Sequence, residues 1–389
     1  MALDPKALAD RARAIPPFIV VDVIDRAAEM QRAGEDVIML AVGEPDFPTP
    51  ACIVAAAEQA LRQGKTKYTP SLGVPPLREA IAEDYRRRYQ VEVSPDQIIV
   101  TPGTSPAMFL VFSGLLEAGD EIILSDPGYP CYKNMIEYLA GRAVRVPVFE
   151  EDGFQYRPRM IQEQITGRTK AILINSPSNP TGNLLEPERM AEIARLGPLV
   201  ISDEIYHGLV YAGREHSILE FTERAVVLNG FSKRYSMTGW RVGYAILPPE
   251  MVRPLQKVQQ NFFISTGDFV QWAALAALRE AGPEVERMRR TYDQRRRLML
   301  QGLRALGFGI TVEPTGAFYV LANAKKFSGD SYRLAFDLLL QAKVGVAPGI
   351  DFGPNTEGYL RFSYAAGEEQ IQEGLRRIGR YLQTLPVRT

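Results

Sequence analysis

The residue with the clearest potential for chemistry is Lys233, which lies within the segment Asn229–Tyr244. It comes just after an apolar run, residues 225–228, that predicts a buried strand. A lysine whose pKa is lowered by burial and neighbouring cations becomes a nucleophile for carbonyl compounds and a proton carrier. Arg234 and Arg241 supply such cations, and Arg241 can bind a phosphate through two parallel hydrogen bonds. Because an isolated lysine is more often a solvated surface residue, the other motifs must decide between these interpretations.

A second motif, Thr101–Ala107, follows the predicted strand 98–100 and precedes a predicted helix over residues 108–116. The free N–H groups and positive dipole end at a helix N-terminus attract anions. Thr104 and Ser105 add two hydroxyl groups. The motif therefore suits a phosphate group, although a plain turn with Thr104 or Ser105 as N-cap explains it more simply when it is taken alone.

Asp203 ends another apolar run, residues 199–202, and is expected to be partly buried. A buried carboxylate is unfavourable unless it meets a cation or several hydrogen-bond donors. The N–H group of a pyridinium ring is such a partner, and the carboxylate would keep that nitrogen protonated. Tyr206 could donate a hydrogen bond to an oxygen on the same ring. A structural alternative is that Asp203 is a helix N-cap.

Two further segments carry polar groups that could bind a ligand. Asn175–Gly182 contains two X-Pro bonds and a glycine, which predicts a rigid turn, with a cis bond as one option, from which Asn179 can aim its amide. Arg361 lies in the β-like apolar run Tyr359–Ser363. A half-buried guanidinium group matches a substrate carboxylate, and the alternative is a structural salt bridge.

The elements that would position these residues are short apolar runs that alternate with helical stretches between Pro50 and Leu247. Runs without clean polar alternation predict strands buried on both faces, as in a mostly parallel sheet covered by helices. Ligands bind at the carboxyl ends of such strands. We therefore predict an α/β fold with strands at residues 98–100, 121–125, 143–148, 171–175, 199–202, 225–228 and 242–247.

A chain of 389 residues exceeds the usual size of one hydrophobic core, and its pattern changes after Leu247. Helical patterns are followed by a mixture of short strands and helices, which predicts a smaller α+β domain. The N-terminal segment 18–41 is expected to pack with it, because chain ends commonly meet. We predict a large domain over residues 48–285 and a small domain formed by residues 1–47 and 286–389.

Composition argues against several other classes of function. A formal net charge of -1 gives no basis for a nucleic-acid surface. No apolar run approaches the ~20 residues that span a bilayer, and residues 1–17 lack the apolar core of a signal peptide. Two cysteines, Cys52 and Cys131, indicate a reducing compartment, so we expect a cytoplasmic protein. His207 and His216 are the two histidines, and no Cys/His cluster has metal-ligand spacing, so no metal is expected.

Taken in order, these motifs resemble the class I/II aminotransferases, the fold-type I pyridoxal-phosphate enzymes that include aspartate and aromatic aminotransferases. The resemblance runs nearly end to end. It implies pyridoxal 5'-phosphate as cofactor and ping-pong transfer of an amino group from an L-amino acid to a 2-oxo acid. The matching segments are Ala41–Pro50, Lys67–Gly73, Thr101–Ser105, Asp126–Pro130, Asn179–Gly182, Asp203–Tyr206, Phe231–Lys233 with Arg241, and Arg361.

The resemblance also implies a role for each motif. Lys233 would hold the cofactor as a Schiff base and carry the proton between the amino acid's α-carbon and the cofactor. Asp203 would keep the pyridine nitrogen protonated, so that the ring serves as an electron sink. The other cofactor contacts would be Asn179 and Tyr206 at the ring oxygen, Tyr129 on the ring face, and Thr104, Ser105, Ser232 and Arg241 at the phosphate. Tyr68 would reach the phosphate from the other subunit of a homodimer, and Gly43, Asn179 and Arg361 would bind the substrate's α-carboxylate.

The sequence leaves the amino donor open. Some aspartate-preferring members of the family carry a lysine in the phosphate turn, where this chain has Ser105. The segment Pro16–Val20, a candidate substrate cap, is apolar. Both features favour aromatic or other neutral donors over aspartate, with 2-oxoglutarate as an acceptor. The alternatives are a pyridoxal-phosphate-dependent lyase, decarboxylase or synthase on the same fold, and a non-catalytic sensor that binds the cofactor.

Overall fold

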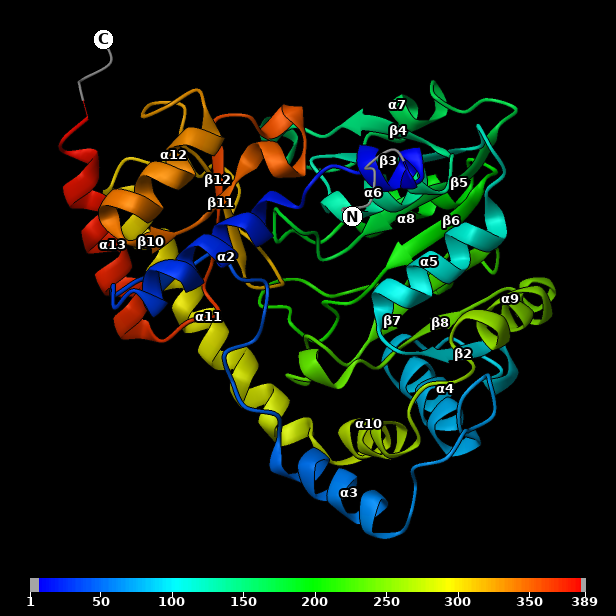
Figure 1. Ribbon diagram of the computed structural model, residues 1–389. Coiled ribbons are helices and arrows are strands. Elements are labelled where there is room, and N and C mark those ends of the chain that lie inside the picture. The colour runs from blue at the N-terminus through cyan, green and yellow to red at the C-terminus, as the bar shows by residue number, and fades with distance from the viewer. Residues whose placement is uncertain (1–6, 386–389) are drawn as a thin grey trace.

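The computed structural model describes residues 7–385, and its centre is a seven-stranded sheet with the order β2-β8-β7-β6-β5-β3-β4 (Figure 1). The pairs β3/β4, β3/β5, β5/β6 and β6/β7 are parallel, while β8 runs antiparallel to both β2 and β7. The predicted strands and the mostly parallel sheet are therefore confirmed. The strands are β2 (Ile98–Thr101), β3 (Glu121–Asp126), β4 (Arg142–Pro147), β5 (Thr169–Asn175), β6 (Leu199–Asp203), β7 (Ala225–Gly230) and β8 (Gly243–Ile246).

Helices cover both faces of this sheet, which explains why its inner strands are mostly apolar (Figure 1). In β2, Ile98 and Val100 belong to one buried cluster and Ile99 belongs to another. One cluster includes side chains of α4 (Pro75–Tyr89) and α8 (Pro187–Ala194). The other includes side chains of α5 (Thr104–Leu115), α6 (Pro130–Tyr138) and α9 (Pro249–Phe262).

The segment 18–41 packs with the C-terminal part of the chain in a second region, as predicted. The strand β1 (Ile38–Met39) pairs in parallel with β10 (Val344–Gly345). Beside them lies a three-stranded antiparallel sheet with the order β11-β12-β9. Its strands are β9 (Tyr319–Asn323), β11 (Ala347–Pro348) and β12 (Tyr359–Ser363), and the helices here include α2 (Ile19–Arg32), α12 (Ser331–Asp337) and α13 (Glu368–Leu382).

One long helix, α11 (Gly282–Ala305), connects the two regions. It contacts α10 (Asp268–Glu280) near its start and α13 and β9 further on, as its course in Figure 1 shows. The division of the chain at residues 47 and 285 stays a prediction. The remaining helices are α1 (Asp10–Ala14), α3 (Ala51–Arg62) and α7 (Pro158–Gln162).

One helix differs from its predicted range. The helix predicted to begin at Met108 begins at Thr104, because Pro106 falls in the first turn, where a missing N–H group leaves no helical hydrogen bond unmade. The helix α12 ends at Asp337 and continues as a π-helical turn, Leu338–Ala342. Within residues 7–385, no helix has the length and apolar character needed to cross a membrane.

Candidate active site

A cavity of about 220 Å³ lies where β2, β5, β6 and β7 end, the edge of a parallel sheet at which ligands bind. Every predicted site residue except Tyr68 lines it, and these residues come from segments far apart in the sequence. They are Gly43, Thr104, Ser105, Tyr129, Asn179, Asp203, Tyr206, Ser232, Lys233, Arg241 and Arg361. The structure therefore brings together residues that the sequence placed in separate motifs, while their individual roles stay predictions.

Lys233 reaches into this cavity from the loop after β7, and its Nζ donates a hydrogen bond to the carbonyl oxygen of Gly43 at 2.7 Å. Burial, together with the charges of Arg241 and Arg361, lowers the pKa of Lys233 to about 8 against the opposing charges of Glu44 and Asp203. A neutral amine is thus more accessible here than on a surface lysine. This environment suits a nucleophile for an aldehyde group.

The lowered pKa of Lys233 should affect how fast pyridoxal phosphate attaches to the cofactor-free protein. The rate of covalent attachment of pyridoxal phosphate should rise with pH and level off above about 8, because the neutral form of Lys233 then predominates. Stopped-flow absorption over a series of pH values measures this rate. A blocked free lysine in the same buffers is the control, and its rate should keep rising towards about 10.4. If the rate for the protein depends on pH in the same way as the rate for the blocked lysine, the pKa of Lys233 is not lowered.

Asp203 lies at the carboxyl end of β6 and is 4% exposed. Its Oδ2 accepts a hydrogen bond from the hydroxyl of Tyr132 at 2.6 Å, and its Oδ1 accepts one from the N–H of Ile205 at 3.1 Å. The chain continues from Asp203 into a turn, so the helix N-cap alternative is wrong. Burial raises the pKa of Asp203 to about 6. A buried carboxylate that faces a cavity fits the N–H group of a pyridinium ring.

The turn at the start of α5 also lines the cavity. Gly103 is the N-cap of α5 and no side chain caps the helix, so the N-cap alternative for Thr104 and Ser105 is wrong. Gly103 has φ +111°, and a Cβ there would lie 2.6 Å from Nη2 of Arg241. Glycine thus lets the guanidinium group lie against the turn. Helix N–H groups, hydroxyls and a guanidinium group together fit a phosphate.

Arg361 is 2% exposed and lies in β12. Its Nη1 donates to Oδ1 of Asn179 and its Nη2 donates to the carbonyl oxygen of Ala41, both at 2.7 Å. In the described part of the chain, no carboxylate forms an ion pair with this guanidinium group, so the salt-bridge alternative finds no support. A buried cation without a counter-charge fits the carboxylate of a substrate.

Asn179 is held beside Arg361 by a rigid turn. The bonds Ser176–Pro177 and Asn179–Pro180 are both cis, as the sequence left open. The N–H of Asn179 donates to Oδ1 of Asn175 at 2.8 Å, and Nδ2 of Asn175 donates to the carbonyl oxygen of Asp203 at 2.9 Å. The turn is therefore tied to the end of β6 that carries Asp203.

Several residues that line the cavity were missed at the level of sequence. Tyr132 follows Tyr129 by three positions, and that helical spacing could have indicated a shared face. Tyr319 comes from β9, and its hydroxyl lies 2.9 Å from the hydroxyl of Tyr206. No local pattern indicates this contact. The apolar cap is also shifted from the predicted residues 16–20, since it consists of Phe18, Val20, Val21 and Ile24.

Tyr68 is 82% exposed and does not line the cavity of its own chain. Its predicted contact with the phosphate requires a second subunit, so it stays a prediction. Within residues 7–385, no group of three or more His, Cys, Asp or Glu side chains is arranged to hold a metal ion.

Fold and cavity together define an enzyme that uses pyridoxal phosphate, and comparison with known proteins agrees. The family model described as aminotransferase class I and II matches residues 35–378. The chain belongs to this family. It is a pyridoxal-phosphate-dependent aminotransferase that transfers amino groups between amino acids and 2-oxo acids, which removes the lyase, synthase and sensor alternatives.

Individual relatives are similar over nearly their whole length. An aspartate/prephenate aminotransferase of Thermus thermophilus is 41% identical, with 97% of this chain and 99% of that protein covered. A valine–pyruvate aminotransferase of Mycobacterium tuberculosis is 39% identical, with 95% and 97% covered. The solved structure of the aspartate aminotransferase from Thermus thermophilus with maleate superposes with a TM-score of 0.92 at 41% identity, covering 96% of this chain and 99% of that one.

Proposed function

We propose that this aminotransferase prefers aromatic or other neutral L-amino acids to aspartate as donors, with 2-oxoglutarate as an acceptor. The apolar wall of the cavity carries this proposal. It is formed by one face of α2 together with Met108 of α5 and contains Phe18, Val20, Val21 and Ile24. An apolar wall favours an apolar side chain and leaves a second carboxylate without a partner.

The charges in the cavity support the same preference. Among the described residues, the cations that line it are Lys233, Arg241 and Arg361, and each is assigned here to the cofactor or to the α-carboxylate. Ser105 stands where some aspartate-preferring members of the family carry a lysine. The names of the relatives include both aspartate/prephenate and valine–pyruvate aminotransferases at similar identity, so identity alone does not select the donor.

The proposed roles of the residues follow from their positions. Bound pyridoxal phosphate supplies a ring that withdraws electrons from the substrate's α-carbon. Arg361, Asn179 and the main chain at Gly43 bind the α-carboxylate and orient the substrate. Lys233 Nζ takes the proton from the α-carbon and returns it. Asp203 holds the ring nitrogen in its protonated form.

The remaining contacts hold the cofactor in place. Tyr206 and Asn179 hold the ring oxygen, and Tyr129 packs on the ring. The phosphate is bound by Thr104, Ser105, Ser232 and Arg241. When bound there, the cofactor would carry the amino group from the donor, which leaves as its 2-oxo acid, to the acceptor 2-oxo acid, which becomes the new amino acid.

The enzyme is also proposed to be a cytoplasmic homodimer. Exposed Tyr68 would then approach the phosphate of the partner subunit. Cys52 and Cys131 are both free thiols, which is typical of a reducing compartment.

A donor panel tests the proposal. With 2-oxoglutarate as acceptor, kcat/KM for phenylalanine or leucine should exceed that for aspartate by about tenfold or more, because a distal carboxylate would be buried without a cation. Single-turnover absorption with each amino acid measures the first half-reaction separately. In the matched variant Ser105→Lys, kcat/KM for aspartate should rise. A panel in which only aspartate and glutamate react would contradict the proposal.

A further inference from the structure

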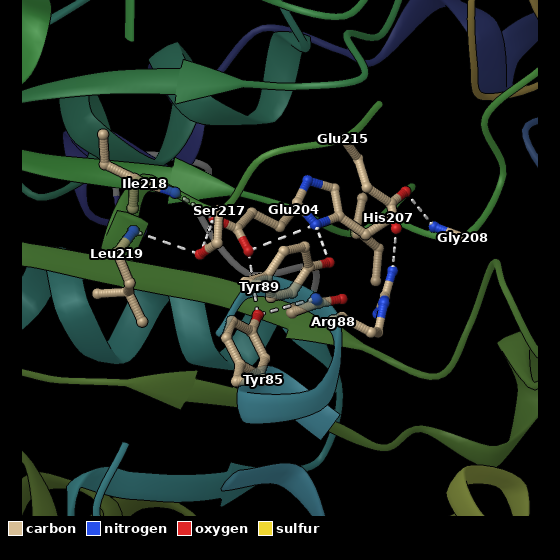
Figure 2. Close-up of polar contacts among 12 residues, drawn as sticks. Tyr85, Arg88, Tyr89, Glu204, His207, Gly208, Glu215, Ser217, Ile218 and Leu219 are labelled. Atoms are coloured by element: carbon tan, nitrogen blue, oxygen red, sulfur yellow. Dashed lines mark hydrogen bonds and ion pairs between the residues drawn. The ribbon is translucent and has the colours of Figure 1, made fainter. Parts of the chain in front are cut away.

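Glu204 follows Asp203 directly in the sequence but does not line the cavity; its carboxyl group lies in a buried polar network (Figure 2). It is 0% exposed. Its Oε1 accepts hydrogen bonds from the hydroxyl of Ser217 at 2.9 Å and from the N–H of Ile218 at 3.0 Å, and its Oε2 accepts one from the hydroxyl of Tyr85 at 3.1 Å. None of these partners lines the cavity.

This carboxyl group has no cationic partner among the described residues. The nearest titratable nitrogen, Nδ1 of His207, lies 3.5 Å from its Oε2. Burial lowers the pKa of His207 to about 4, so the ring is neutral near pH 7. Burial also raises the pKa of Glu204 to about 7. A buried carboxyl group without a cation is less favourable for stability than an apolar side chain of similar size. Its presence therefore calls for a role other than stability.

The network continues from Glu204 to the other side of the site. The hydroxyl of Tyr85, which donates to Glu204, accepts a hydrogen bond from Nδ2 of Asn229 at 3.2 Å. The main-chain carbonyl oxygen of Asn229 in turn accepts a hydrogen bond from the hydroxyl of Thr104 at 3.2 Å. Asn229 lies at the end of β7, which leads to Lys233, and Thr104 opens α5.

We propose that Glu204 is a positioning residue whose carboxyl group, acting through Tyr85 and Asn229, fixes the ends of β7 and α5 relative to Asp203. The proposal rests on the roles given above to Asp203, Lys233 and Thr104. A cofactor that contacts Asp203 at its ring nitrogen and the α5 turn at its phosphate bridges the segments that this relay connects. Movement between them weakens both contacts, because a rigid site binds more tightly than one that must be ordered.

The same network has a second branch that serves as a control. The hydroxyl of Tyr89 lies 2.6 Å from Nδ1 of His207. Arg88 pairs with Glu215, whose Oε2 accepts the N–H of Gly208 at 2.6 Å (Figure 2). Tyr89 lies one helical turn after Tyr85 in α4 and is also buried. Its hydroxyl has no hydrogen bond to Asn229 or Thr104.

Two variants remove the relay with little change of shape. In Glu204→Gln, the side-chain oxygen can still accept from Ser217 and Ile218, but its NH2 group then faces the hydroxyl of Tyr85, whose O–H group loses its acceptor. In Tyr85→Phe, the hydroxyl is absent. Tyr89→Phe is the matched control, because it removes a buried hydroxyl from the same helix.

The holoenzyme, without amino acid, provides three measurements: the dissociation constant of pyridoxal phosphate, the pH at which its visible absorption changes, and the melting temperature. In Glu204→Gln and Tyr85→Phe, we expect the dissociation constant to rise by about tenfold and the pH of the absorption change to shift. The dissociation constant of the double variant should be no higher than that of the single variant that binds the cofactor more weakly. Tyr89→Phe should lower the melting temperature and leave the other two quantities unchanged.

Two results would overturn the inference. One is that Glu204→Gln and Tyr85→Phe lower the melting temperature but bind and titrate the cofactor as the unmodified protein does, which would make Glu204 a purely structural residue. The other is that the two losses of cofactor affinity add up in the double variant, which would exclude Tyr85 as the residue through which Glu204 acts. Absence of the visible absorption band from the unmodified protein would instead refute the role proposed for Lys233, so the two failures are distinguishable.

Discussion

Replacement of Lys233 with alanine should lower the turnover number by about 10⁴-fold, the upper end of what a positioned proton-transfer group contributes. Within the described chain, no other lysine lines the cavity, so no other primary amine can bind the cofactor or return the proton to the α-carbon. Steady-state rates with a neutral donor and 2-oxoglutarate measure the loss. Mass spectrometry after borohydride reduction should show added cofactor mass in the unmodified protein and none in the variant.

Lys170→Ala is the matched control for this prediction. Lys170 is exposed and lies near the start of β5, at the opposite end of the strand from the site, where its Nζ is 3.5 Å from Asp120. Such an exposed ion pair contributes about 0–1 kcal/mol, so this variant should keep full activity and the added mass. Retention of the added mass in Lys233→Ala would show that another residue holds the cofactor.

The central sheet could be predicted because its signal is local. Each strand except the edge strand β4 is a short, mostly apolar run buried on both faces, and such runs are visible without knowledge of their neighbours. The direction of β8 was not predicted. The connection between Gly230 and Gly243 contains the Lys233 loop but no α-helix. A strand that pairs in parallel with the one before it usually needs a crossover helix between them. The absence of a helical pattern in this connection could therefore have predicted the antiparallel pairing of β7 and β8.

The residues of the site also fall into two groups: those that a local sequence pattern predicts and those that long-range packing brings to the site. Thr104 and Asp203 follow strand ends, so the strand prediction also placed them at the site. Tyr319 contacts Tyr206 across 113 residues of chain, and the relay from Glu204 passes through Tyr85, 119 residues away. Contacts of this kind arise only when separate elements pack together. No periodicity or turn signal in either segment specifies the partner.

Asp203→Asn should lower kcat by about 10²- to 10³-fold with little change in KM, because removing one partner of a buried charge pair is strongly unfavourable. The amide has nearly the same shape, and its oxygen can still accept from the N–H of Ile205, while its NH2 group faces the hydroxyl of Tyr132. It carries no negative charge to keep the ring nitrogen protonated. Burial raises the pKa of Asp203 to about 6 against the hydrogen bonds from Tyr132 and Ile205, and a cationic ring nitrogen would lower this pKa. The unmodified enzyme should therefore keep its activity down to about pH 6 and lose it only at lower pH, and the variant should not show this decline.

Asp126→Asn is the control for Asp203→Asn. It shows what the loss of a buried carboxylate does when that carboxylate does not line the cavity. Asp126 is 7% exposed at the end of β3, which β5 separates from β6, and its Oδ1 accepts the N–H of Asn355 at 3.3 Å. It does not line the cavity. This variant should lower the melting temperature yet keep kcat within a few-fold of the unmodified enzyme. Equal losses of kcat in both variants would mean that Asp203 acts through stability, whereas a selective loss in Asp203→Asn with its altered pH profile would place its charge at the ring nitrogen.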